Sequence, residues 1–346
     1  MILSPRERAE NSILEEFEKF RSKIEPTEQE KSSISSSHTK IRGILSNSDV
    51  INIVDSFLTG SYARQTMIRP LKDVDFFVQI HYGNHKNETS GQLLRKILIV
   101  LRKAYPLTPI SIASPCVTIK FSYCDFEIVP AIGFSDNEEL YKIPDNAGTG
   151  WQETYPKIPD KWITQENKKA EGLFIPTIKI LKKWRDTHCR SLRSFHLEML
   201  ARIAFDHYKI NNYAEGVLAF FERANYLFGL YKTAPFIQEP GRNGIYVDQY
   251  LYGNPIMLGV VKRRVTMDCA TARKAFEYMN KGMIGASKTA WINLLGNSFC
   301  PQVIPTLAPP FSALSSFSNP IIPKSHTALP SFMSELLKRQ KNEYDS

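Results

Sequence analysis

The chain has 346 residues, room for one large domain or two ordinary ones, and its 42% hydrophobic and 23% charged residues are typical of a globular protein. No apolar run approaches the roughly 20 residues of a membrane-spanning helix, and the charged N-terminus has no signal-peptide core, so we expect a cytoplasmic protein with no membrane partner. The net charge of +9 favours an anionic partner, such as a nucleoside triphosphate or a nucleic acid.

Cysteine and histidine spacing does not predict a zinc centre. The five cysteines are scattered without a CxxC spacing, which argues against a disulfide framework and a structural zinc site. His188, Cys189 and His196 are close in sequence, but zinc usually takes four ligands, and two more are missing nearby.

The first 50 residues predict two helices. Apolar residues recur at three- and four-residue spacing on both sides of a break at Glu25-Pro26-Thr27. We expect residues 1–50 to pack on a helical half of the protein.

Strands are expected at about 51–58, 73–81, 109–113, 116–123 and 125–130, with a helix at about 90–105. This order predicts a small mixed sheet with helices on one face. We expect residues 51–165 to form a catalytic region whose last part, 136–162, is a long ordered connection, because it carries Pro, Gly and Asn without periodicity.

Helical patterns then return over 165–233 and 261–283, which predicts a helical region at 166–300. The fold class expected is therefore mixed α+β with two halves. Residues 301–346 contain seven prolines and eight serines, which predicts an extended or disordered tail.

The main chemical signal is GSYARQT at 60–66 followed by DVD at 73–75. Alternate side chains of a strand share a face, so Asp73 and Asp75 point the same way, and two such carboxylates are costly together unless a cation lies between them. Mg²⁺ suits them because it prefers oxygen ligands and keeps positions for phosphates. Gly60 lets a phosphate approach the backbone closely, and Ser61 offers a hydroxyl and an N–H group.

A centre with two metal ions needs a third carboxylate. The segment YCDFEIVPAI offers Asp125 and Glu127, again on one face of a strand. We expect Glu127 to be the third ligand, with Asp125 as the fallback.

The order Gly-Ser, Asp-x-Asp and an acid before x-Val-Pro resembles the DNA polymerase β-like nucleotidyltransferases. It is most similar to their oligoadenylate synthetase and cyclic GMP-AMP synthase branch, the bacterial CD-NTases of anti-phage (CBASS) defence. The resemblance covers roughly residues 50–300 and includes IPDNAGTGW at 143–151, ETYP at 153–156, LKKW at 181–184 and SFHLEML at 194–200. Where the family normally has aspartate, this chain has Glu127.

The resemblance implies a bilobed fold with the active cleft between a sheet lobe and a helical lobe. It implies catalytic, metal-binding roles for Asp73, Asp75 and Glu127, with two Mg²⁺ ions, or Mn²⁺ in their place. Gly60, Ser61, Lys182 and Ser194 would bind the nucleotide phosphates. The residues alone favour a surface lysine at Lys182 and a helix N-cap at Ser194.

Other positions stay open between a binding role and a structural one. Arg64 and Thr66 are either phosphate contacts or parts of a turn. Trp151 and Tyr246 could stack on a base, although core packing is the more common role of such residues. Three residues of the helical region are expected in the core: Trp184, Phe195 and Leu197.

The function implied by the resemblance is template-independent synthesis of a cyclic di- or trinucleotide from NTPs, with release of pyrophosphate. Its partners would be ATP, alone or with another NTP, a downstream effector that responds to the product, and a nucleic-acid activator. Two alternatives stay open: nucleotidyl transfer to RNA or protein, and a non-catalytic nucleotide- or RNA-binding protein on a decayed enzyme fold.

Overall fold

A computed structural model describes residues 3–85, 87–134, 139–206, 209–231, 233–242 and 244–301. Residues 1–300 form one compact unit. The predicted tail at 301–346 lies outside the described residues, apart from Pro301. None of the described helices is both long enough and apolar enough to cross a membrane.

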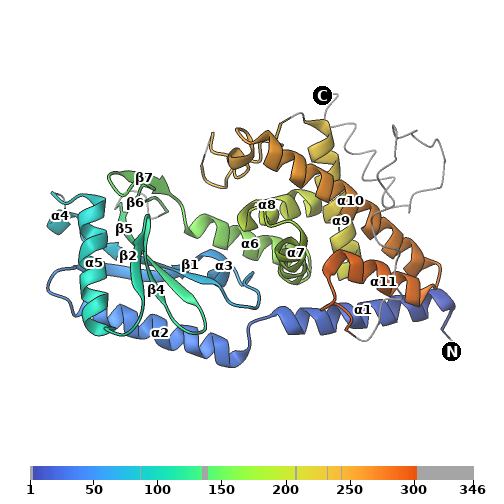
Figure 1. Ribbon diagram of the computed structural model, residues 1–346, viewed down its shortest axis with the longest axis horizontal. Coiled ribbons are helices and arrows are strands. Elements are labelled where there is room, and N and C mark those ends of the chain that lie inside the picture. Colours follow the sequence, from blue (N-terminus) through green and yellow to red (C-terminus); the bar gives the residue numbers. More distant parts are fainter. Residues whose placement is uncertain are drawn as a thin grey trace. The chain divides into compact units, whose positions relative to one another are not determined.

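In the described part of the chain the strands of the sheet are β1 (Ile53–Thr59), β2 (Asp73–Ile80), β3 (Ile110–Ala113), β4 (Cys116–Lys120), β5 (Asp125–Gly133), β6 (Tyr141–Pro144) and β7 (Trp151–Thr154). The DVD segment begins β2, an interior strand that lies between β1 and β5 in the sheet (Figure 1). Their order is β1-β2-β5-β4-β3, with β6 and β7 added beside β5. Strands β2 and β5 pair in parallel, whereas the other pairs are antiparallel.

One face of the sheet is covered by helices, as the sequence predicts. Helices α2 (Glu28–Ser46) and α5 (Ser90–Ala104) pack there, and their apolar residues share a core with Val74, Phe76 and Val78 of β2. Two short helices, α3 (Gly60–Ala63) and α4 (Tyr82–His85), follow β1 and β2. Because side chains alternate along β2, the core-facing row leaves Asp73 and Asp75 on the opposite face.

The helical half consists of α1 (Pro5–Ile24), α6 (Lys157–Lys169), α7 (Phe174–His188), α8 (Ser194–Phe205), α9 (Tyr213–Leu230), α10 (Pro255–Asn280) and α11 (Ile284–Leu295), with a short 3₁₀ helix at Gln249–Leu251. Its core contains Trp184, Phe220 and Phe221, whose rings meet edge to face. Trp184 and Leu197 are fully buried, as predicted.

The N-terminal helices differ from the expectation that both pack on the helical half. Helix α1 packs there, against α7, α9, α10 and α11, but α2 packs on the sheet. The break between them is the predicted one: Ile24 ends α1, and Thr27 caps α2 by accepting a hydrogen bond from the Glu30 amide. Each helix buries its apolar stripe, so the break lets one N-terminal segment serve both halves.

The sequence pattern does not predict several of the helices and strands. The segment 136–162, expected to be a connection, contains β6, β7 and the start of α6. The two strands have four residues each, which is too short for a periodic signal. Pro156 and Pro159 resemble helix breakers, but they lie at the start of α6, where a missing N–H costs nothing. Helix α11 lies beyond the helical stretch expected at 261–283, and Gly282, with φ of +75°, separates it from α10.

Candidate functional site

Four acidic residues share one face of the parallel pair β2 and β5. Asp73 is the register partner of Asp125, and Asp75 is the partner of Glu127. Register partners on parallel strands project to the same side, so the central strands present all four carboxyls away from the helix-covered face. The pairing of the two strands therefore brings Asp125 beside Asp73 and Glu127 beside Asp75, although each pair is 52 residues apart in sequence.

Burial and mutual repulsion perturb two of these acids. Burial, followed by the charge of Asp73, raises the pKa of Asp75 to about 6. Burial, followed by the charges of Asp75 and Asp73, raises the pKa of Glu127 to about 7. Carboxyls that resist ionisation in this way gain from a bound cation, because a cation stabilises the ionised form.

The two candidates for a third metal ligand lie two residues apart on β5. Glu127 lies beside Asp75 in the register, and after burial the charge of Asp75 contributes most to raising its pKa. Asp125 is at the first position of β5, where its amide donates to the carbonyl of Lys72 at 2.8 Å.

Gly60 and Asp75 are in close contact. Gly60 has φ of +68°, and a Cβ at this position would lie 1.7 Å from Oδ2 of Asp75. Only glycine both adopts this backbone conformation readily and leaves room for the carboxylate. The Gly-Ser turn that follows β1 is thus built directly against the acidic face of β2.

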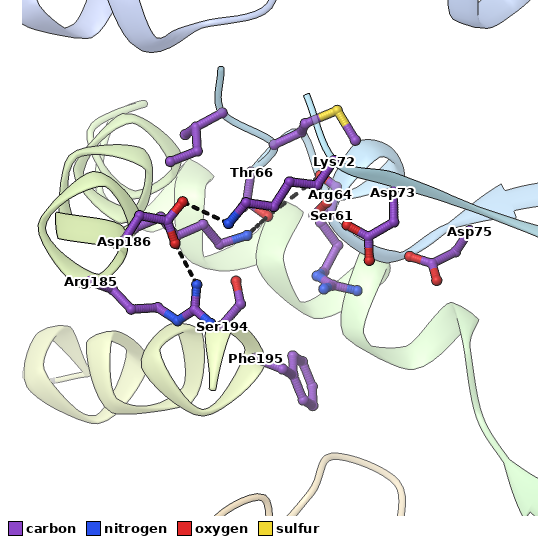
Figure 2. A pocket seen from close by; sticks show the side chains of 13 residues that line it. Ser61, Arg64, Thr66, Lys72, Asp73, Asp75, Arg185, Asp186, Ser194 and Phe195 are labelled. Atoms are coloured by element: carbon purple, nitrogen blue, oxygen red, sulfur yellow. Dashed lines mark hydrogen bonds and ion pairs between the residues drawn. The ribbon is translucent and has the colours of Figure 1, made fainter. Parts of the chain in front are cut away.

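A pocket of about 300 Å³ opens where this turn meets the helical half (Figure 2). Figure 2 shows Asp73 and Asp75 on its sheet side, and Arg185, Ser194 and Phe195 on helices opposite them. It is lined by Ser61, Arg64, Thr66, Met67, Ile68, Lys72, Asp73, Asp75, Lys182, Arg185, Asp186, Ser194 and Phe195. Of the residues expected to act at the site, Gly60 and Glu127 do not line the pocket but lie against Asp75.

An ion-pair chain connects the sheet side and the helical side of the pocket. Lys72, which directly precedes Asp73, contacts Oδ2 of Asp186 on α7 at 2.7 Å. Oδ1 of Asp186 is 2.6 Å from the guanidinium of Arg185. Figure 2 shows both contacts at one end of the pocket, with Asp73 and Asp75 toward the other end.

Lys182 is held below the pocket. It is 4% exposed, its ammonium donates to the Thr66 hydroxyl at 2.8 Å, and it is 2.6 Å from Oε1 of Glu198. Sequence reasoning missed Glu198, although a signal exists: it lies four residues after Ser194, on the same face of α8 as the pocket residue.

The Arg64 side chain lines the pocket and contacts residues of α6 and α8. Its Nε donates to Oε2 of Glu198 at 2.8 Å, and its guanidinium carbon lies 5.1 Å from the centre of the Phe195 ring. Asp160 on α6 is 3.8 Å from Nη1 of Arg64, and burial raises the pKa of Asp160 to about 6. The prediction that Phe195 is a core residue is wrong: its ring is half-buried and lines the pocket, because Ser194 begins α8 at the pocket wall.

The two other aromatic candidates do not line this pocket. Trp151 is half-buried and packs against the core between the sheet and its helices. Tyr246 belongs to an aromatic group with Phe236 and Tyr252 in the segment between α9 and α10.

The chain is similar to a known family model and to several cyclic-nucleotide synthases. Residues 12–167 match the family model described as the Second Messenger Oligonucleotide or Dinucleotide Synthetase domain. A cyclic AMP-AMP-AMP synthase from an Acinetobacter species is 28% identical over 301 residues, which cover 82% of this chain and 84% of the relative. An Escherichia coli CBASS oligonucleotide cyclase, CdnC, is 29% identical over 180 residues, 47% of this chain and 54% of that one.

The fold is also found among solved structures. The structure of E. coli MS115-1 CdnC with ATP superimposes with a TM-score of 0.67 at 19% sequence identity. The superposition covers 83% of this chain and 98% of CdnC. The predicted mixed α+β nucleotidyltransferase fold, with a sheet half and a helical half, is thereby confirmed.

Proposed function

We propose that this chain, which is similar to the CD-NTase nucleotidyltransferases, joins nucleoside triphosphates into a cyclic oligonucleotide second messenger for anti-phage signalling. The observation that carries the proposal is the register of β2 and β5, which gathers Asp73, Asp75 and Glu127 beside the Gly60–Ser61 turn. Such a group of carboxylates next to a phosphate-sized pocket suits phosphoryl chemistry.

The donor set fits a divalent metal such as Mg²⁺. All the candidate ligand atoms are oxygens, which this ion prefers. The pKa values of Asp75 and Glu127 are raised, so a bound cation would favour their ionised forms. Among the described residues no group of three or more His, Cys, Asp or Glu side chains is arranged so that these side chains alone could hold a metal ion. Mg²⁺ does not require one, since it is usually held by one or two carboxylates together with waters and substrate phosphates.

We assign Asp73 and Asp75 to the ion that accompanies the triphosphate, and Glu127, with the two aspartates, to a second ion. When bound, the ions would neutralise phosphate charge and lower the pKa of the attacking ribose hydroxyl. Asp125 is the fallback for Glu127.

The phosphates would rest on groups from both sides of the pocket. Ser61 and Gly60 offer the turn, and Ser194 offers a hydroxyl from the first residue of α8. Lys182 would add positive charge from below. These donors hold the triphosphate so that its α-phosphorus faces the acidic strands, and charge-assisted hydrogen bonds favour the departing pyrophosphate.

Phe195 would receive a nucleobase. Its ring lines the pocket beside Ser194, and one ring face already interacts with Arg64. An aromatic ring at the pocket wall provides sequence-tolerant stacking.

In each transfer a ribose hydroxyl oxygen forms a bond to the α-phosphorus of a second nucleotide. The bond between that phosphorus and the α–β bridging oxygen breaks, pyrophosphate leaves, and the hydroxyl proton passes to solvent. Repetition lengthens a linear intermediate, and a last transfer between its two ends closes the ring. The product would activate an effector in the cytoplasm.

The test is incubation of the full chain with labelled NTPs and Mg²⁺, followed by chromatography and mass spectrometry. ATP is the first substrate to test, because the Acinetobacter relative is named a cyclic AMP-AMP-AMP synthase. Phosphatase-resistant product formed from NTPs alone supports the proposal. Label recovered only at the mass of an added RNA or protein acceptor would contradict it. If the small product forms only when nucleic acid is added, and the nucleic acid itself stays unlabelled, the nucleic acid is an activator.

A further inference from the structure

A buried carboxylate on α8 gathers three donors from distant parts of the chain. Glu198 has no exposed surface. Its Oε2 accepts from Nε of Arg64 at 2.8 Å, and its Oε1 accepts from the Thr66 hydroxyl at 2.9 Å and lies 2.6 Å from Nζ of Lys182. The donors precede Glu198 by 134, 132 and 16 residues, so the carboxylate joins the segment after α3 to α7 and α8.

Glu198 is ionised at neutral pH in spite of its burial. Burial raises its pKa, but the charges of Arg64 and Lys182 and the hydrogen bonds outweigh burial and bring the pKa to about 2. A carboxylate this deep is tolerated because each oxygen has a charged partner. Removal of the carboxylate would leave two buried cations without their shared anion.

Thr66 connects Glu198 to the phosphate-binding turn. The amides of Thr66 and Met67 both donate to the carbonyl of Ser61, at 2.9 and 3.0 Å. Between them and the turn lies Gln65, with φ of +58°, a conformation that costs a non-glycine residue about 1–3 kcal/mol. The surrounding contacts must hold this segment in place, and the Thr66 hydroxyl makes two buried hydrogen bonds, one to Glu198 and one from Lys182.

Lys182 depends on the same carboxylate for its charge. Burial lowers the pKa of Lys182, Glu198 raises it, and Arg64 and Arg185 lower it. The charge of the Lys182 ammonium also acts to lower the pKa of Asp75 on β2. A lysine buried without an anion tends to lose its proton. Two of its three N–H donors serve Thr66 and Glu198, so one remains for a phosphate oxygen.

We propose that Glu198 is a positioning residue for the triphosphate: it fixes the Ser61 turn through Thr66 and keeps the Lys182 ammonium in place beneath the pocket. The inference rests on the proposed function, because it assigns the pocket to a triphosphate. Glu198 itself does not line the pocket and acts through its partners.

The test variant is Glu198→Gln, which keeps the shape of the side chain and removes its charge. The KM for ATP and kcat are measured from pH 6.5 to 8.5, beside the wild type. We expect KM to rise at least about tenfold at pH 8.5, the effect of weakening a charged hydrogen bond, with a smaller change in kcat. The increase should shrink as the pH falls, because a lower pH favours the protonated form of a lysine that has lost its anion.

Two further variants separate positioning from general stability. Thr66→Val removes the hydroxyl link but keeps the pair of Lys182 and Glu198, so KM should rise without a new pH dependence. Glu222→Gln breaks the ion pair between the buried Glu222 carboxylate on α9 and the exposed Arg273 on α10, and it serves as the control. It should lower the melting temperature and leave KM unchanged.

A Glu198→Gln protein with wild-type KM at every pH would overturn the inference. If that variant does not fold, Thr66→Val decides, and a wild-type KM for it would be equally fatal. If the wild type forms no product, the proposed function fails, but calorimetric Kd values for Mg²⁺–ATP still decide the inference. A Kd that rises in Glu198→Gln and not in Glu222→Gln supports it, and equal Kd values contradict it.

Discussion

The carboxylate of Asp75 occupies the space where a side chain on Gly60 would begin: a Cβ there would be 1.7 Å from Oδ2. The phosphate-binding turn and the acidic strand thus share one small volume. We expect Gly60→Ala to displace Asp75 and to reduce kcat/KM by about 100-fold or more, since a shift of about 1 Å at a catalytic group has effects of this size.

The control for this change is Gly172→Ala. Gly172 also has a left-handed backbone, with φ of +90°, but a Cβ there would meet no atom within 4 Å. Steady-state kinetics and melting temperatures of both variants should show lost activity for Gly60→Ala and only lost stability for Gly172→Ala. Equal kinetic losses would mean that backbone strain, and not Asp75, explains the first result.

Asp73 and Asp75 provide the most direct test of the catalytic assignment. Asp73→Asn or Asp75→Asn should reduce product formation at least about 10³-fold, because a lost or misplaced metal removes several kcal/mol of transition-state stabilisation. Circular dichroism and melting temperature should show an intact fold. A double variant that still forms product near the wild-type rate would exclude the assignment.

Glu127 and Asp125 can be distinguished by substitution. Glu127→Gln should eliminate product formation but keep much of the ATP binding, which depends chiefly on Ser61, Lys182 and the two aspartates. Asp125→Asn should be mild, and Glu127→Asp tests whether the backbone tolerates the shorter side chain. An inactive Asp125→Asn beside an active Glu127→Gln would reverse our choice.

The pKa of Glu127 also predicts how stability depends on pH. Its folded-state pKa of about 7 lies above the ordinary 4.5, so in metal-free protein this group favours folding most below pH 4.5, and the benefit is lost as pH rises to about 7. Thermal unfolding in chelator should therefore find Glu127→Gln increasingly more stable than the wild type between pH 5 and pH 8. Glu153→Gln, at an exposed position of β7, is the control for removal of a surface charge.

Phe195 is expected to affect nucleotide affinity. Phe195→Ala should raise KM for ATP about fivefold or more, the lower range for loss of base stacking, and Phe195→Trp should retain affinity. Phe236→Ala is the control, because Phe236 is exposed but does not line the pocket. An unchanged KM in Phe195→Ala would contradict base stacking and would mean that the ring only packs against Arg64.

The sequence predicts the strands that carry the acids because their signals are local. Alternation in DVDFFVQI predicts both the core row and the acidic row, and the sheet keeps both. The pairing of Asp75 with Glu127 is not local: it depends on β5 inserting beside β2, which strand propensity does not specify. The resemblance to a known family, rather than periodicity, supplied that proximity.

The helical side of the pocket was harder to predict. Phe195 fits an apolar pattern, so it was assigned to the core, and its place at the pocket wall depends on where α8 begins. Glu198 lies in an apolar stretch, where an acid at first suggests an exposed turn of helix. Its burial depends on Arg64 and Thr66, more than 130 residues away, and no pattern within α8 encodes those partners.

The packing of α1 also has a consequence for how the chain is made. Phe17 lies 5.0 Å from Trp291 and 4.8 Å from Phe299, measured between ring centres, and Glu16 accepts a hydrogen bond from Lys288, 272 residues later. During synthesis α1 leaves the ribosome before α11, so the part of its apolar stripe that packs on Trp291 and Phe299 stays uncovered until those residues emerge. Contacts this distant in sequence slow folding and leave intermediates prone to aggregation. Expression at reduced temperature, or with a chaperone that shields the nascent N-terminal helix, should therefore raise the yield of folded protein more than any change within the sheet.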